Sequence, residues 1–184
     1  MRPRAYLAGP DVFLPGAVAH ARRKEAICAR HGIEGLSPLN EDVPALGSDA
    51  GWAAIYQKDI AMMEACALVI ANLTPFRGVS ADSGTLIEVG WFLGRGRPVF
   101  GYTNSAATFA DRSSAYLAAV PDALPDLAVE RFGLPDNLMI SGAVLQGGHP
   151  IMLPGDGQDR TFDSLEVFEA CVVMAARSLG DRSA

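Results

Sequence analysis

One acidic residue stands alone in an apolar helical segment. Glu88 lies within the run LIEVGWFL, and the positions three and four residues away on either side carry no basic residue. The ion pair that usually forms across one helical turn is therefore missing. A buried carboxylate without donors shifts toward its neutral form, as functional carboxylates do. From these residues alone two interpretations stay open: a functional acid, or a glutamate that reaches water from a partly exposed helix.

Other candidate residues also have ordinary explanations. Asp59 follows Lys58 in a helical pattern and fits an exposed acid that pairs locally. Tyr6, inside a short apolar run, is more often a core aromatic than a catalytic phenol. Three further large side chains are predicted to lie in the core by default: Phe13, Trp52 and Met139.

Alternating strand and helix patterns surround these residues. Strands are predicted at 5–8, 33–36, 67–71 and 98–102, and helices at 16–31, 52–65, 83–95 and 161–178, the last capped by Thr161. Residues 37–51 form a loop, residues 103–136 receive no assignment, and residues 138–145 fit a strand or a packed loop. This alternation predicts an α/β fold with a doubly wound parallel sheet in a single domain.

Ligands of such sheets bind beyond the carboxyl ends of the strands. Polar residues follow three predicted strands, in Gly9-Pro10-Asp11, in Asn72-Leu73-Thr74 and in the loop 78–84. Asp82 ends that loop, where its carboxylate would cap the next helix. The loop lacks the glycine and lysine spacing of a phosphate-binding loop.

Composition narrows the class of partner. The 184 residues carry a net charge of -6 and no basic stripe, which argues against nucleic acid. The one basic run, Arg22-Arg23-Lys24, is predicted to be a solvated helix face. Three distant cysteines, Cys28, Cys66 and Cys171, suggest buried thiols in a reducing compartment, with neither a zinc site nor a disulfide framework.

The chain shows no targeting or membrane pattern. Gly9, Pro10 and Asp11 follow the first residues too soon for a signal peptide. No apolar run approaches the roughly 18 residues of a membrane helix. We therefore expect a soluble cytoplasmic protein that does not associate with membranes.

Three motifs together resemble the nucleoside 2-deoxyribosyltransferase family. YLAGPDVF is similar to that family's Y-L-A-G-P followed by an aromatic, and DSGTLIEVG, residues 82–90, is similar to its D-x-G-T-x-x-E-x-G signature. DNLM, residues 136–139, resembles its N-x-M segment. The motifs occur in the family's order across residues 5–139, so the resemblance covers most of the chain.

The resemblance implies a flavodoxin-like domain, expected to span residues 1–184, that transfers 2-deoxyribose between bases in nucleotide salvage. Glu88 would attack C1′ of a 2′-deoxynucleoside and form a covalent deoxyribosyl-enzyme, which a second base then resolves with net retention. Tyr6 would orient Glu88, and Asp59 would protonate the departing base and deprotonate the incoming one. Neither a cofactor nor a metal is implied.

The resemblance also implies how substrate is held. Asp82 would bind the 5′-hydroxyl, with Gly9, Pro10 and Gly84 in the substrate-binding loops. Phe13 and Trp52 would flank the base. Asn137 and Met139 would reach into the site of a neighbouring subunit, so a homo-oligomer with shared sites is expected, either a dimer or dimers assembled into a larger ring. The partners would be nucleosides and free nucleobases.

Competing activities remain open at this stage. A related branch hydrolyses deoxynucleoside 5′-monophosphates, but the Asp82 carboxylate would repel a phosphate, and Pro10-Asp11 replaces a run of Ser, Gly and Arg. A plain nucleoside hydrolase would use the same covalent intermediate, so sequence does not separate transfer from hydrolysis. A non-catalytic nucleoside-binding domain is a third interpretation, against which the joint presence of Tyr6, Asp82 and Glu88 counts.

Overall fold

Four parallel strands form one sheet at the centre of the molecule. The computed structural model describes residues 2–39, 49–120 and 128–181. The strands are β1 (Arg4–Ala8), β2 (Glu34–Leu36), β3 (Leu68–Asn72) and β4 (Val99–Tyr102), in the order β2-β1-β3-β4. Every residue of β3 and β4 is buried, as expected for strands covered on both faces. All four predicted strands are confirmed.

A rudimentary fifth strand extends the sheet beyond β4. Met152 forms a single parallel bridge with Tyr102. Its amide donates to the carbonyl of Gly101 at 2.9 Å, and its carbonyl accepts from Thr103 N at 2.9 Å. The order 2-1-3-4 with this added position is the flavodoxin-like order. The fold prediction is confirmed.

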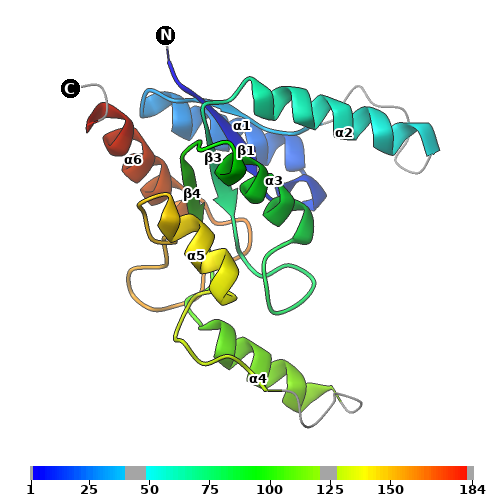
Figure 1. The fold of residues 1–184 in the computed structure, drawn as a ribbon, viewed down its shortest axis with the longest axis vertical. Coiled ribbons are helices and arrows are strands. Elements are labelled where there is room, and N and C mark those ends of the chain that lie inside the picture. The colour runs from blue at the N-terminus through cyan, green and yellow to red at the C-terminus, as the bar shows by residue number, and fades with distance from the viewer. Residues whose placement is uncertain (1, 40–48, 121–127, 182–184) are drawn as a thin grey trace.

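Helices cover both faces of the sheet (Figure 1). α1 (Ala17–Arg30) and α6 (Glu166–Asp181) pack on one face, where Ile27 and Phe168 belong to one buried cluster. α3 (Ser83–Gly94), α5 (Leu138–Gln146) and the end of α2 (Asp49–Glu64) pack on the other face, around Phe92 and Val144. The short helix η1 (Pro10–Phe13) follows β1, and α4 (Phe109–Ala119) lies away from the sheet.

Two helix assignments differ from the sequence predictions. Residues 138–146 form α5, not a strand or a packed loop, because the Asn137 side chain caps the helix by accepting from Met139 N at 3.0 Å. The C-terminal helix begins at Glu166, not near Thr161, because the Asn104 amide holds the carbonyl oxygens of Thr161, Phe162 and Ser164 in a turn. α4 lies in the segment that received no assignment.

The side-chain predictions also need correction. Phe13, Trp52 and Met139 are not core residues, since 57%, 68% and 72% of their surfaces are exposed. Arg22 and Arg23 are exposed as predicted, but Lys24 is buried, with 2% of its surface accessible. Its ammonium group lies 4.7 Å from the centre of the Phe168 ring and bonds to an acid described below.

Other predictions from composition concern thiols and membranes. Cys28, Cys66 and Cys171 are free and buried, as predicted. Within the part of the chain that the structure describes, no helix has the length and apolar character needed to cross a membrane.

Candidate active site

A cavity of about 490 Å³ lies where the loop after β1 meets α2 and the start of α3. Six of the residues predicted for the site line it: Gly9, Phe13, Asp59, Asp82, Gly84 and Glu88. The other lining residues are mostly apolar: Val12, Ala17, Val18, Pro38, Leu39, Ile55 and Thr85. An apolar cavity with few converging carboxylates suits a small ligand that has an apolar body and hydrogen-bonding groups.

The central contact of the cavity joins α3 to β1. Tyr6 Oη donates to Glu88 Oε1 at 2.6 Å, across a sequence separation of 82 residues. Tyr6 is fully buried and stacks against Phe92, with ring centres 6.1 Å apart. Burial and the neighbouring Glu88 charge hold the pKa of Tyr6 far above its usual range, so the phenol keeps its proton and acts as a donor. The expected contact between these residues is present, and its role in catalysis stays a prediction.

The pKa of Glu88 lies near neutral pH. Burial raises its pKa to about 7; the hydrogen bond from Tyr6 opposes that rise, and the charges of Asp59 and Asp82 add to it. None of the residues that shift this pKa is a cation, so no positive charge offsets the effect of burial. The group therefore changes its charge in the range where enzymes use nucleophiles and general bases.

Asp59, from α2, is not the exposed, locally paired acid of the ordinary explanation. Lys58 Nζ donates instead to the carbonyl of Leu39 at 3.3 Å. Asp59 Oδ1 is buried and has no hydrogen-bond partner among the described residues. Burial raises the pKa of Asp59 to about 6, against the lowering effect of the Lys58 charge. A partnerless carboxylate oxygen on a cavity wall is suited to exchange a proton with a ligand.

Asp82 caps α3, as predicted. Its Oδ2 accepts from Thr85 N at 3.0 Å and from Thr85 Oγ1 at 3.2 Å. Both bonds use Oδ2, and no bond from a described residue reaches Oδ1. A Cβ on Gly84 would lie 3.1 Å from Asp82 Oδ2, so a larger residue at this position would crowd the carboxylate.

The first loop passes close to β3. A Cβ on Gly9 would lie 2.7 Å from the Cβ of Asn72 and 2.8 Å from Asp11 Oδ2, so only glycine fits there. Pro10, the buried first residue of η1, continues this loop and does not line the cavity. Asp11 accepts from Lys24 Nζ at 2.7 Å and from Asn72 Nδ2 at 2.9 Å.

Sequence reasoning missed this ion pair, although a signal was present. Lys24 lies three residues after Ala21 and four before Cys28, on the apolar stripe that faces the sheet. Burial alone would raise the pKa of Asp11. The Lys24 charge and bonds from His20, Lys24 and Asn72 outweigh burial and hold that pKa well below its usual range.

Phe13 belongs to an aromatic group that the sequence analysis also missed. Its ring stacks on Phe76 with centres 5.5 Å apart, and Phe76 contacts Phe162 at 6.0 Å. The Arg77 guanidinium lies 5.0 Å from the centre of the Phe13 ring. These contacts fix the orientation of the Phe13 ring at the cavity wall.

Comparison with known proteins decides the family. Residues 5–139 match the family model described as nucleoside 2-deoxyribosyltransferase. The chain belongs to the nucleoside 2-deoxyribosyltransferase family. Among solved structures it is similar to a 2-desoxiribosyltransferase from Leishmania mexicana, with a TM-score of 0.66, 27% identity and coverage of 95% of this chain and 97% of that one.

Two further matches cover less of the chain. A 2-deoxyribosyltransferase from Bacillus psychrosaccharolyticus shares the fold, with a TM-score of 0.51, 17% identity and coverage of 84% and 87%. An uncharacterized protein of Schizosaccharomyces pombe is 30% identical over 118 residues. That match covers 62% of this chain and 56% of the yeast protein, so it spans only about half of its relative.

Five of the residues that the family resemblance points to do not line the cavity of this chain: Tyr6 and Pro10, described above, and Trp52, Asn137 and Met139. Trp52 is on α2, and Asn137 and Met139 are at the start of α5. Asn137 Nδ2 donates to Glu130 at 3.1 Å, and Met139 faces outward from the chain. Of the two aromatic residues expected to flank the base, only Phe13 therefore lines this cavity.

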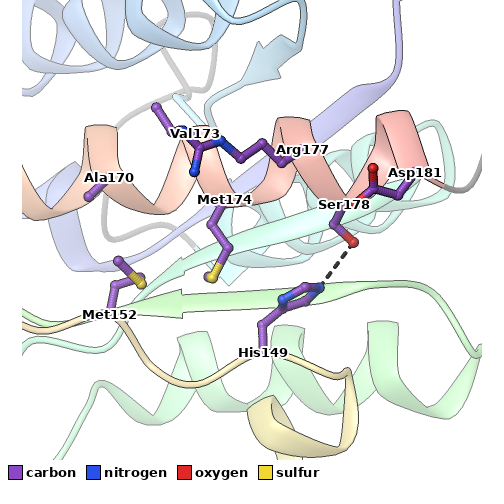
Figure 2. A pocket seen from close by; sticks show the side chains of 8 residues that line it. All are labelled: His149, Met152, Ala170, Val173, Met174, Arg177, Ser178 and Asp181. Atoms are coloured by element: carbon purple, nitrogen blue, oxygen red, sulfur yellow. Dashed lines mark hydrogen bonds between the residues drawn. The ribbon is translucent and has the colours of Figure 1, made fainter.

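A larger cavity, of about 700 Å³, lies between α6 and the segment around Met152 (Figure 2). His149 Nε2 pairs there with Ser178 Oγ at 3.0 Å, and the His149 ring stacks on Phe100 at 4.8 Å. Met152 and Met174 supply an apolar lining. None of the family's motif residues lines this cavity, so size alone does not mark the active site here. Among the described residues, no group of three or more His, Cys, Asp or Glu could hold a metal ion.

Proposed function

We propose that the protein transfers a 2-deoxyribosyl group between nucleobases through a covalent intermediate on Glu88. The observation that carries this proposal is a single cavity in which two of the three lining carboxylates, Glu88 and Asp59, have different surroundings. Glu88 has a buried phenol as its donor, and Asp59 has a buried oxygen without a partner. Pairs of acids with different environments are the usual basis for dividing nucleophile and acid roles.

In the first half-reaction, an ionised Glu88 oxygen bonds to C1′ as the N-glycosidic bond breaks. The electron pair of that bond goes to the base nitrogen, and the proton of Asp59 follows it. In the second half-reaction, Asp59 takes the proton from an incoming base whose nitrogen bonds to C1′. The ester bond to Glu88 then breaks, and its electrons return to the carboxylate. Two inversions at C1′ give net retention.

This sequence of steps needs one proton on the pair of acids. The pKa of Asp59 is raised to about 6 and that of Glu88 to about 7, so the reactive form, with the proton on Asp59, is the minor one of the two singly protonated forms, and both forms have the same pH dependence. Between those values the singly protonated pair predominates. For an ordinary base, kcat/KM should therefore follow a bell-shaped pH profile with its maximum between about 6 and 7.

Two residues of the cavity wall are proposed to recognise the substrate. We propose that Asp82 accepts from the 5′-hydroxyl through Oδ1 and that Phe13 lies against the base. The Asp82 carboxylate disfavours a 5′-phosphate by repulsion. The Leishmania mexicana relative bears the name of a 2-desoxiribosyltransferase, which favours transfer over the alternatives.

We further propose a homo-oligomer in which Asn137 and Met139 complete a neighbouring site. Met139 is 72% exposed at the start of α5, and Ile87, next to the proposed nucleophile on α3, is 73% exposed. Both side chains are available to an adjoining subunit. A cross-subunit site would appear twice in a two-fold dimer.

Chromatography of a reaction that contains deoxyinosine and free adenine tests the proposed activity. New deoxyadenosine is the expected product. Free hypoxanthine with free deoxyribose would mean hydrolysis, and an unchanged mixture would favour a binding domain. A 2′-fluoro-2′-deoxynucleoside should leave added mass on the peptide that contains Glu88, and its absence from that peptide would remove Glu88 as nucleophile.

A further inference from the structure

One buried carboxylate outside the cavity joins two loops. Asp136 has 1% of its surface exposed and accepts from Ser80 Oγ at 2.5 Å and Ala81 N at 2.9 Å. It also accepts from Asn137 N at 2.8 Å. The carboxylate therefore ties the loop before α3 to the turn before α5, across more than 50 residues of sequence.

Arg112, on α4, reinforces the same connection. Its guanidinium donates to the carbonyl oxygens of Val79 at 2.8 Å and Pro135 at 2.7 Å, and also to that of Ala107. A rigid planar fork with three carbonyl partners fixes their relative positions better than a single bond would. The loop 79–81 is thus held from both its carbonyl and its amide side.

Asp82 directly follows this loop. The Ala81 amide that Asp136 holds is one residue before Asp82, and the Asp82 side chain is bound to α3 through Thr85. The place of the Asp82 carboxylate is therefore set by two anchors, one on either side along the chain. The anchor at Asp136, like the bond from Arg112 to Val79, comes from outside the loop and α3.

We infer that Asp136 is a positioning residue that sets the Asp82 carboxylate for the 5′-hydroxyl of the substrate. This inference rests on the proposed function, in which Asp82 receives that hydroxyl. Asp136 does not line the cavity, and it reaches Asp82 through its bonds to Ser80 and Ala81. It makes the preference for a 5′-hydroxyl depend on a residue that never touches substrate.

The test is a substrate comparison on Asp136→Asn. The amide keeps one acceptor oxygen and brings an NH₂ group against the backbone N–H of either Asn137 or Ala81, so one of these donors loses its partner and the loop must shift. For deoxyinosine, kcat/KM should fall about tenfold, whereas for 2′,5′-dideoxyinosine it should change less than about twofold. The ratio of the two values does not depend on the fraction of folded enzyme, so partial unfolding of the variant does not obscure it.

Asp159→Asn is a matched control. Asp159 also accepts from a backbone amide, Ala106 N at 2.6 Å, and from Ser105 Oγ at 3.2 Å, but it holds a different loop. Its ratio should equal that of the wild type. In an Asp82→Asn background, the added Asp136→Asn change should leave the ratio unchanged, because the group that it positions is already altered.

Three results would overturn the inference. Equal losses for both substrates would make Asp136 a general structural residue. A further change of the ratio in the Asp82→Asn background would mean that Asp136 acts by another route. If the wild type turns over neither substrate, the proposed function fails on its own, and calorimetric binding of the same two nucleosides takes the place of rates. Asp136→Asn should then narrow their affinity ratio, and an unchanged ratio would reject the inference.

Discussion

Two partly buried acids, Asp11 after β1 and Glu88 on α3, have their pKa values shifted in opposite directions. Asp11 is bonded to the Lys24 ammonium and the Asn72 amide, and its pKa lies well below the usual range. Glu88 has one neutral donor, Tyr6, and its pKa is raised to about 7. Burial penalises the charge of both acids, so the difference lies in the partners. Groups of the protein compensate the charge of Asp11, whereas the carboxylate of Glu88 can still interact with a ligand.

Asp11 is an acid that stabilises the fold, whereas Glu88 is an acid suited to reaction. A buried ion pair costs much to break because the remaining charge has no partner. A buried acid without a cation costs stability while it is charged, and it persists where function requires it. Removing the charge should therefore have opposite consequences for folding in the two regions.

The largest expected effect is on activity in Glu88→Gln. Loss of a nucleophile typically lowers turnover by about four to six orders of magnitude. Deoxyribosyl transfer by this variant, measured in the deoxyinosine and adenine reaction, should be near background. Turnover above about a tenth of the wild-type value would contradict the nucleophile role.

The free energy of unfolding of the same variant should increase at high pH. The raised pKa means that the folded state holds the proton more tightly than the unfolded chain does. The wild type therefore loses stability as pH rises from about 4.5 through about 7. Glu88→Gln escapes this loss, so it should gain on the order of 2 kcal/mol in unfolding free energy at pH 8 relative to pH 5. Glu34→Gln, at an exposed acid paired with Arg4, is the matched control and should show no such gain.

The next effect is selective for the leaving base. Asp59→Asn should lower kcat/KM for deoxyinosine by about 100-fold or more, because its base needs a proton to depart. For 2′-deoxy-7-methylguanosine, whose base leaves as a neutral molecule, the loss should stay within a few-fold. Equal losses for both nucleosides would assign Asp59 a structural role.

The third effect is on stability, in the Asp11 region. Lys24→Met leaves a buried carboxylate without its cation and should lower the unfolding free energy by about 3–5 kcal/mol. Denaturant titration at pH 7 measures this change. Arg22→Met, two residues earlier on the exposed face, should change stability by less than about 0.5 kcal/mol. Adding Asp11→Asn to Lys24→Met should recover part of the loss, and a double variant less stable than the single one would mean that the pair is not the source of the effect.

Most of the sheet and the cavity could be predicted because their signals are local. The apolar runs of β1 and β3 and the lone Glu88 within an apolar helix need no knowledge of distant residues. The charge of Lys24 predicts a surface position, whereas its place on the apolar stripe of α1 indicates burial. Asp136 and Arg112 join segments far apart in the chain, and no spacing within one segment reveals such a contact. The start of α6 depends in the same way on Asn104, which is about 60 residues away.

The smallest expected effect isolates the single donor that Glu88 has. Tyr6→Phe removes the hydroxyl and keeps the ring packed on Phe92, so the fold should persist. The bond from Tyr6 lowers the pKa of Glu88, and its loss should raise that pKa above about 7. With 2′-deoxy-7-methylguanosine, which does not need Asp59, kcat/KM should rise with pH through the ionisation of Glu88, and ionisation of the substrate itself cancels in the ratio of variant to wild type. The rise should move to higher pH in Tyr6→Phe, with a loss of about tenfold at pH 6 that shrinks toward pH 9. A loss of the same size at every pH would mean that Tyr6 orients Glu88 without changing its charge, and the contrast with Asp11 would then rest on burial alone.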